Sequence, residues 1–152
     1  MSLTLTDSPL LSGMSSAQLA LVEASATEVS FTTGERVFAE GQPANGCWLL
    51  FRGCVALDAT IPGRGQVIVQ TLGPGDVLGW SWLTPPYRWH FGARALEPTA
   101  AILLDTGQLR ALAEQDPSFG YALATRLLVV ALDRLQATRA RLLDLYRNPH
   151  AR

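Results

Sequence analysis

The stretch "FTTGERVFAEGQPANGCWLLFRGCVAL", residues 31–57, alternates short apolar and β-branched runs with Gly, Pro and Asn. Runs of this kind are typical of β-strands, and the residues between them are typical of tight turns. The pattern continues through "LGPGDVLG", residues 72–79, and working outward we count eight such runs between residues 28 and 105. The sequence therefore predicts a β-roll of the jelly-roll or double-stranded β-helix kind over 28–105.

Helical patterns flank this β region on both sides. A serine at 15 or 16 followed by "AQLALVEASA" predicts an N-terminal helix over 15–27. The helical period returns over 107–146, which predicts a C-terminal pair of helices, the second of them long. With 152 residues and 48% hydrophobic content, the chain is expected to form one mainly β domain, 1–152, with flanking helices.

The overall composition limits the kinds of partner that the chain is expected to have. A formal charge of −1 gives no field that would draw it onto nucleic acid or an anionic membrane. There is neither an apolar run long enough to span a bilayer nor a secretion signal at the N-terminus, so we expect a cytoplasmic protein. Cys47 and Cys54 fall in strand-like runs, seven residues apart. They are expected to point to opposite faces and to stay reduced.

The last helical segment contains a seven-residue repeat. Leu128, Leu135 and Leu142 recur at this interval, and the intermediate positions of the same face are Ala131, Thr138 and Leu145. Such a face predicts a seam between two copies of the helix, and hence a homodimer. The alternative is that the helix packs only on its own β-roll.

Several short motifs occur along the chain in the order that is typical of a known family. They are Gly34-Glu35, Glu40-Gly41, Gly53 and "GPGD" at 73–76. On these motifs the chain, from about Leu10 to Tyr146, resembles the cyclic nucleotide-binding domain of the cyclic-AMP receptor and Fnr type of bacterial regulator. The resemblance implies a phosphate-binding cassette in the loop 75–95. In this family a short helix turns its amides toward the cyclic phosphate, a glutamate holds the ribose hydroxyl and an arginine pairs with the phosphate.

At both of these key positions the sequence departs from the family pattern. Trp80 follows Gly79 where the resemblance implies the glutamate, and Trp89 stands where it implies the arginine. Arg88 lies one residue early, and in an extended segment a shift of one turns a side chain to the opposite face. The family resemblance thus suggests a cyclic nucleotide as the ligand, whereas Trp80 and Trp89 disfavour cyclic-AMP binding.

Aromatic residues replace charges throughout this cassette. One interpretation is a remodelled pocket in which they stack on a planar or apolar effector. The other is a pocket filled by its own indoles, in a domain that dimerises but senses nothing. The candidate ligand-binding residues are Gly79, Trp80, Ser81, Trp82, Tyr87, Arg88, Trp89 and His90.

No arrangement of residues predicts catalysis or a metal site. The family's regulators usually continue into a winged helix-turn-helix, whereas "LLDLYRNPHAR", at the end of this sequence, is too short for one, so we expect no direct DNA binding. The sequence predicts a non-catalytic sensor domain with a degenerate cassette, acting as a dimer through a protein partner or an unidentified ligand. Two alternatives stay open: a cyclic-nucleotide regulator with a non-standard pocket, and a non-sensing structural dimer module.

Overall fold

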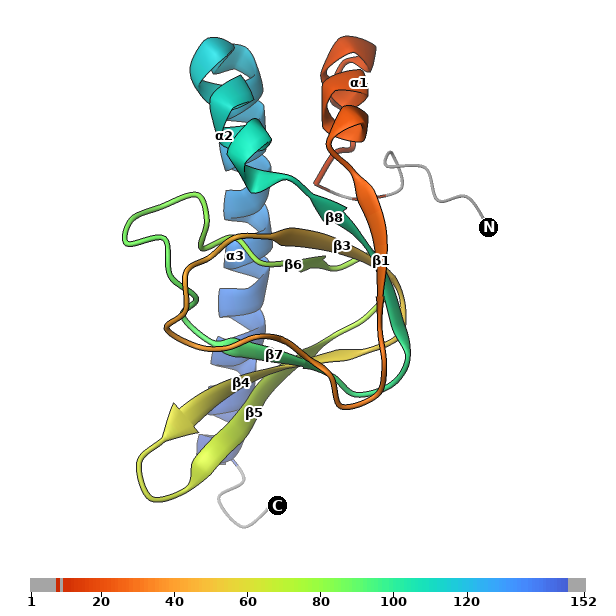
Figure 1. Ribbon diagram of the computed structural model, residues 1–152. Helices are drawn as coiled ribbons and strands as arrows, with labels where there is room; N and C mark the ends of the chain where they lie inside the picture. Colours follow the sequence, from red (N-terminus) through yellow and green to blue (C-terminus); the bar gives the residue numbers. More distant parts are fainter. Residues whose placement is uncertain (1–7, 9, 148–152) are drawn as a thin grey trace.

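Two four-stranded antiparallel sheets roll around each other and are flanked by three helices (Figure 1). This computed structural model describes residue 8 and residues 10–147, so the ends of the predicted 1–152 domain lie outside the described residues. One sheet has the order β1-β8-β3-β6 and the other β2-β7-β4-β5. The strands are β1 Thr27–Phe31, β2 Arg36–Phe38, β3 Cys47–Arg52, β4 Val55–Ile61, β5 Gly65–Leu72, β6 Val77–Leu78, β7 Gly92–Ala95 and β8 Thr99–Leu104. The predicted β-roll and its eight strands are confirmed.

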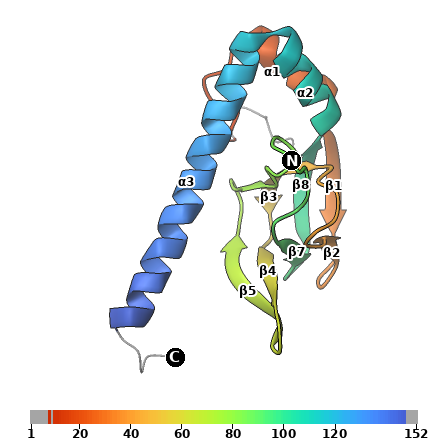
Figure 2. The same ribbon diagram turned by 90° about the vertical axis from the view of Figure 1, so that its left-hand side faces the viewer.

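The helices gather against the first sheet and one side of the roll (Figure 2). They are α1 Ser16–Ala24, α2 Thr106–Gln115 and α3 Pro117–Arg147. Ser15 caps α1, because its hydroxyl accepts from the Gln18 amide at 3.1 Å while the Gln18 side chain accepts from the Ser15 amide. None of the helices that the structure describes has an apolar stretch long enough to cross a membrane.

Two predicted element boundaries were wrong. The first helix ends at Ala24 rather than at 27, because β-branched Thr27 and Val29 pair with β8 instead of continuing the helix. The strand-like run "DVLGW" forms a strand only at its two central residues, Val77 and Leu78. Gly79, at φ +95°, ends the pairing because the left-handed region breaks a strand.

The interior is divided into two hydrophobic clusters. One lies between the helices and the first sheet, and it includes Trp82, Phe119 and Leu123. The other lies inside the roll and contains Phe38 and Trp89. The strand alternation explains this division, since successive side chains point to opposite faces of a strand.

Three arginines attach α3 to the rest of the molecule. Arg126 donates from Nε to the Ser12 carbonyl at 2.9 Å, and Arg141 donates to the Val69 carbonyl at 2.9 Å. Between them, Arg134 donates to the Val77 carbonyl. The acceptor in each case is a main-chain oxygen, so these links depend on the path of the backbone and not on the side chains at the acceptor positions.

The two cysteines lie in different environments. Both are free, Cys47 is buried, and Cys54 is partly exposed. Burial raises the pKa of the Cys47 thiol to about 12, so it stays protonated and unreactive at neutral pH.

In the folded protein a thiol reagent is expected to titrate Cys54 alone, and both thiols after denaturation. Cys54→Ser should leave no rapidly reacting thiol, and rapid reaction of two thiols in the folded wild type would contradict the assignment.

Candidate functional site

The cassette is the irregular segment that connects β6 to β7, and it carries all the predicted ligand-binding residues. It begins at Gly79, where an added Cβ would lie 2.9 Å from the Gly46 carbonyl oxygen and 2.9 Å from the Trp89 ring. Gly79 therefore has a packing role, since its lack of a side chain makes room for Trp89. Near its end the segment pairs with the chain at Pro43, opposite Arg88.

Trp89 lies inside the roll. It is 2% exposed, and its ring stacks on Phe38 with centroids 3.8 Å apart and an interplanar angle of 11°. Trp48 packs against it at 6.0 Å. Its backbone is fixed as well, because its amide donates to the Gln42 carbonyl and its carbonyl accepts from the Gly41 amide. The position that the family resemblance assigns to a phosphate-binding arginine thus holds an indole of the roll core.

Trp82 lies in the other cluster, beneath the helices. It is 1% exposed, and its indole donates to the Gly79 carbonyl at 3.0 Å. The neighbouring Ser81 is buried, and its hydroxyl lies 3.0 Å from Nδ1 of the exposed His90. The polar tips of Trp82 and Ser81 are therefore already paired within the cassette.

Tyr87 and Arg88 lie toward the outside of the cassette. Tyr87 has a φ of 57° and lies under the Arg110 guanidinium of α2, 4.3 Å from its ring centre. Arg88 is exposed and donates to the Gly41 carbonyl at 3.0 Å. Arg88 is thus engaged at the surface with the Gly41 backbone, whereas Trp89 fills the roll interior, so Arg88 does not take the place of the missing arginine.

Trp80 faces α3, and beside it a cavity of about 250 Å³ opens between the roll and that helix. The roll and the cassette contribute Leu57, Val69, Gln70, Trp80 and Phe91, and α3 contributes Ala131, Arg134, Leu135 and Thr138. Of the eight predicted ligand-binding residues, Trp80 lines this cavity and the other seven do not. The structure therefore does not bring the tryptophans around one ligand: Trp89 lies in the cluster inside the roll and Trp82 in the cluster beneath the helices. Half-buried Trp80 packs against the cluster beneath the helices and lines the cavity.

The predicted seam residues share one side of α3. Leu128, Leu135, Leu142 and Leu145 are large apolar side chains that are more than half exposed in the single chain. Ala131, Leu135 and Thr138 also line the cavity beside Trp80. The seam and the cavity are therefore adjacent surfaces of the same helix.

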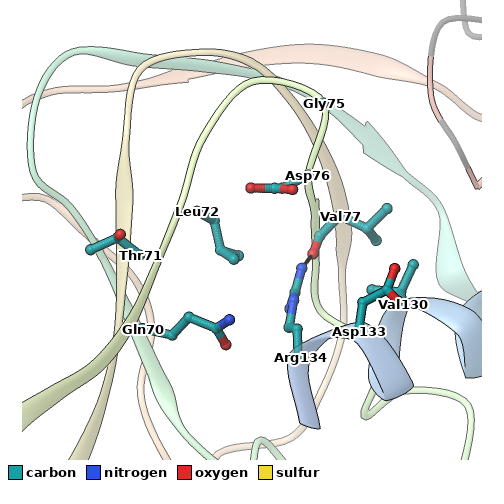
Figure 3. Close-up of a pocket in the computed structure, with 9 residues that line it drawn as sticks. All are labelled: Gln70, Thr71, Leu72, Gly75, Asp76, Val77, Val130, Asp133 and Arg134. Carbon is teal, nitrogen blue, oxygen red and sulfur yellow. Dashed lines mark hydrogen bonds between the residues drawn. The ribbon is translucent and has the colours of Figure 1, made fainter. Parts of the chain in front are cut away.

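Sequence reasoning missed Arg134, which reaches from α3 to the Val77 carbonyl (Figure 3). It lines the cavity beside Trp80 and also a second cavity of about 210 Å³ bordered by Gln70, Asp76 and Asp133. A signal was present in the sequence: Arg134 follows Leu123 and Leu127 on the buried stripe of α3. A cation that continues an inward-facing stripe is a candidate for a functional group.

The chain thus combines a β-roll, an irregular segment between two of its strands and a long helix that borders a cavity beside the roll. Residues 28–116 match the cyclic nucleotide-binding domain family, and the chain belongs to that family. The resemblance inferred from the glycine motifs is thereby confirmed.

Individual relatives agree with this assignment. The chain is 25% identical over 136 residues to a CRP-like cAMP-activated global transcriptional regulator of Mycobacterium tuberculosis, covering 90% of this chain and 59% of that protein. Thus the chain spans 59% of the length of the curated relatives it matches. A putative cyclic nucleotide-binding protein from Geobacter metallireducens has 28% identity and a TM-score of 0.76, with 83% of this chain and 91% of that chain covered.

A third comparison supports the fold alone. The catabolite activator protein of Thermus thermophilus superposes with a TM-score of 0.71 at 24% identity, covering 91% of this chain and 63% of that chain. The same roll and long helix therefore recur in proteins whose sequences have diverged widely from this one.

Proposed function

We propose that this chain is a non-catalytic sensor domain that detects a small molecule in the cavity between Trp80 and α3, and does not bind cyclic AMP in the cassette. We further propose that it acts as a homodimer through the seam of α3 and passes the signal to a protein partner. One observation carries the proposal: the cassette indoles Trp82 and Trp89 are core, while an unfilled cavity lies beside the helix that contains the seam.

The cassette argues against a cyclic nucleotide. An arginine–phosphate pair in a sheltered site contributes about 2 to 5 kcal/mol when judged by truncation, and a charge-assisted bond to a ribose hydroxyl contributes about 1.5 to 3 kcal/mol. Trp80 cannot replace the glutamate at the ribose hydroxyl, because an indole has no negative charge. Trp89 cannot replace the arginine at the phosphate, because an indole has one N–H donor. Trp89 also fills the volume of the roll interior beside Phe38.

The position of the cavity links ligand binding to assembly. Ala131, Leu135 and Thr138 belong to both the cavity wall and the predicted seam. A second copy of α3 packed on the seam would close the outer side of the cavity, because Leu135 is 61% exposed in the single chain. A ligand held there favours the paired state to the extent that it binds that state more tightly.

A second candidate function is a structural dimer module without a ligand. The observation in its favour is the tight stack of Trp89 on Phe38, which leaves the roll interior filled. The two functions differ in what they require of the cavity beside Trp80: a sensor binds a small molecule there, and a structural module does not.

Titration of the wild-type protein with cyclic AMP or cyclic GMP is expected to give no binding at micromolar concentrations. The physical reason is the loss of both the acid and the arginine at Trp80 and Trp89. Isothermal calorimetry is the measurement, with a cyclic-AMP-binding regulator as the positive control. A saturable low-micromolar isotherm would contradict the proposal and would favour a cyclic-nucleotide regulator with a non-standard pocket.

A further inference from the structure

Arg134 has an unusual environment for a charged side chain on a surface helix. It is 8% exposed, and its Nη2 donates to the Val77 carbonyl (Figure 3). Its guanidinium lies 4.4 Å from the centre of the Trp80 ring. Among the residues that the structure describes, its Nη1 is the one buried side-chain nitrogen or oxygen with no hydrogen-bond partner. A buried donor without an acceptor is destabilising, so the site is incomplete as it stands.

The charge of Arg134 is also not neutralised by a direct partner. The ion pair found within the described part of the chain is Arg36–Asp58, at 2.8 Å. Asp76 acts on Arg134 only at longer range, and its carboxylate accepts from the Gly73 amide. Burial lowers the pKa of Arg134 to about 10, so the guanidinium remains protonated at neutral pH. A buried cation with no anion in direct contact is unfavourable.

A second copy of the chain does not supply the missing anion through the seam. With Leu135 at a core position, the flanking positions of the repeat include Arg134, Arg139 and Arg141. Asp133 and Asp144 fall on the outer positions of the same repeat. In a parallel pair of helices the flanking residues face each other, so pairing would bring arginines together and increase the need for an anion.

Of the two cavities that Arg134 lines, one suits an anion. The cavity of about 210 Å³ also has Asp76 and Asp133 in its wall, and these carboxylates would repel an anion. The cavity of about 250 Å³ contains no acid in its lining; its walls are mainly apolar, with Gln70 and Thr138 as polar groups. Its volume lies below the range of about 300 to 1,000 Å³ of drug-sized ligand sites, which indicates a ligand smaller than a nucleotide.

We propose that Arg134 is the receptor for the oxyanion of a small organic acid, a carboxylate or a phosphate, whose apolar body lies against Trp80 and Phe91 in this cavity. The inference rests on the proposed sensor function and names its ligand class. The guanidinium lies over the Trp80 ring and its Nη1 has no hydrogen-bond partner among the described residues, so this nitrogen is the donor we assign to the oxyanion. The anion-binding cation of the domain thus belongs to α3 rather than to the cassette, so the ligand acts directly on the helix of the seam.

The test uses four probes that share one apolar body. Benzoate and phenyl phosphate carry the two kinds of oxyanion, and benzamide and phenol are their uncharged counterparts. Calorimetry and thermal unfolding are expected to detect binding of benzoate, phenyl phosphate or both to the wild-type protein, and to detect weaker binding or none of the uncharged pair. The anion that binds shows whether the site takes a carboxylate or a phosphate, and either result supports the proposal.

The decisive variant is Arg134→Met, which keeps most of the apolar stem and removes the charge. Loss of a charge-assisted bidentate contact is expected to weaken anion binding roughly tenfold to hundredfold. Arg141→Met is the matched control: Arg141 is an exposed arginine one heptad further along α3 that also donates to a carbonyl, and its replacement should leave affinity unchanged. Should Arg134→Met fail to fold by circular dichroism, Arg134→Lys keeps the charge and should retain measurable anion binding.

Three results would overturn the proposal: wild-type anion affinity in folded Arg134→Met, benzamide binding as tightly as benzoate, or no binding of either anion to the wild type. The first two would leave the sensor function intact, because the cavity would then bind a ligand without recognising its charge. The proposed function fails on other results, namely a micromolar cyclic-AMP isotherm or a wild-type protein that is monomeric.

Discussion

Replacing Trp89 with alanine is expected to lower the free energy of unfolding by about 3 to 5 kcal/mol, the usual cost of removing a buried aromatic side chain. The indole is 2% exposed and stacks on Phe38 at 3.8 Å, so its removal loses this contact and leaves a cavity in the roll interior. This loss is a large fraction of the stability of an ordinary domain, about 5 to 15 kcal/mol. Urea unfolding followed by circular dichroism, at matched protein concentrations, measures it.

Trp80→Ala is the matched control, since it removes the same side chain from the same cassette. Trp80 is only half-buried, and it contacts Phe91 edge-on and the Arg134 guanidinium. We expect a loss of about 1 to 2 kcal/mol, in keeping with partial burial and one cation–π contact. If the two variants lose equal stability, or if Trp89→Ala is as stable as the wild type, then Trp89 is not a core residue and the roll interior is open to a ligand.

Replacing Leu135 with glutamate is expected to convert the proposed dimer into a monomer. Burying one leucine contributes about 1.5 to 3 kcal/mol, and the change acts on both copies while placing two like charges together at the seam. The dissociation constant should rise by at least about a hundredfold. Sedimentation velocity over a range of concentrations measures the change, and circular dichroism shows whether the variant keeps its fold.

Two controls separate assembly from the cavity. Leu142→Glu alters the seam at a residue that does not line the cavity beside Trp80, so it should also give a monomer. Gln136→Glu introduces the same charge at an outer position of the repeat and should leave the dimer intact. A monomeric wild-type protein, or a Leu135→Glu variant that stays dimeric, would show that α3 packs only against its own roll.

The fold was largely predictable because strand periodicity and glycine-rich turns are local signals. The runs around β3, β4 and β5 are short and rich in apolar residues, and each is bounded by Gly or Pro, so their existence follows from pattern alone. The end of β6 was not predictable in this way. It depends on the left-handed backbone at Gly79, and that conformation serves a contact with Trp89 ten residues later in the chain.

The candidate site was less predictable because the cassette has no period. In a strand or helix the spacing assigns each side chain to a face, but between β6 and β7 the chain turns irregularly. The sequence therefore identified Trp80, Trp82 and Trp89 as a group without indicating that Trp89 enters the roll interior while Trp82 and Trp80 pack beneath the helices. Arg134 was missed for another reason: a charge on a long helix is usually solvated, so its place on the stripe of Leu123 and Leu127 was a weak signal, and its contact with the distant Val77 carbonyl establishes its burial.

The three arginine links of α3 have a consequence for how sequences of this kind can diverge. Arg126, Arg134 and Arg141 donate to the main-chain oxygens of Ser12, Val77 and Val69. Every residue type presents the same carbonyl, so mutations at the three acceptor positions preserve these hydrogen bonds wherever the backbone keeps its path. Selection to keep these three links therefore acts on the arginine donors, while the side chains at the three acceptor positions of the chain can change without loss of the hydrogen bonds.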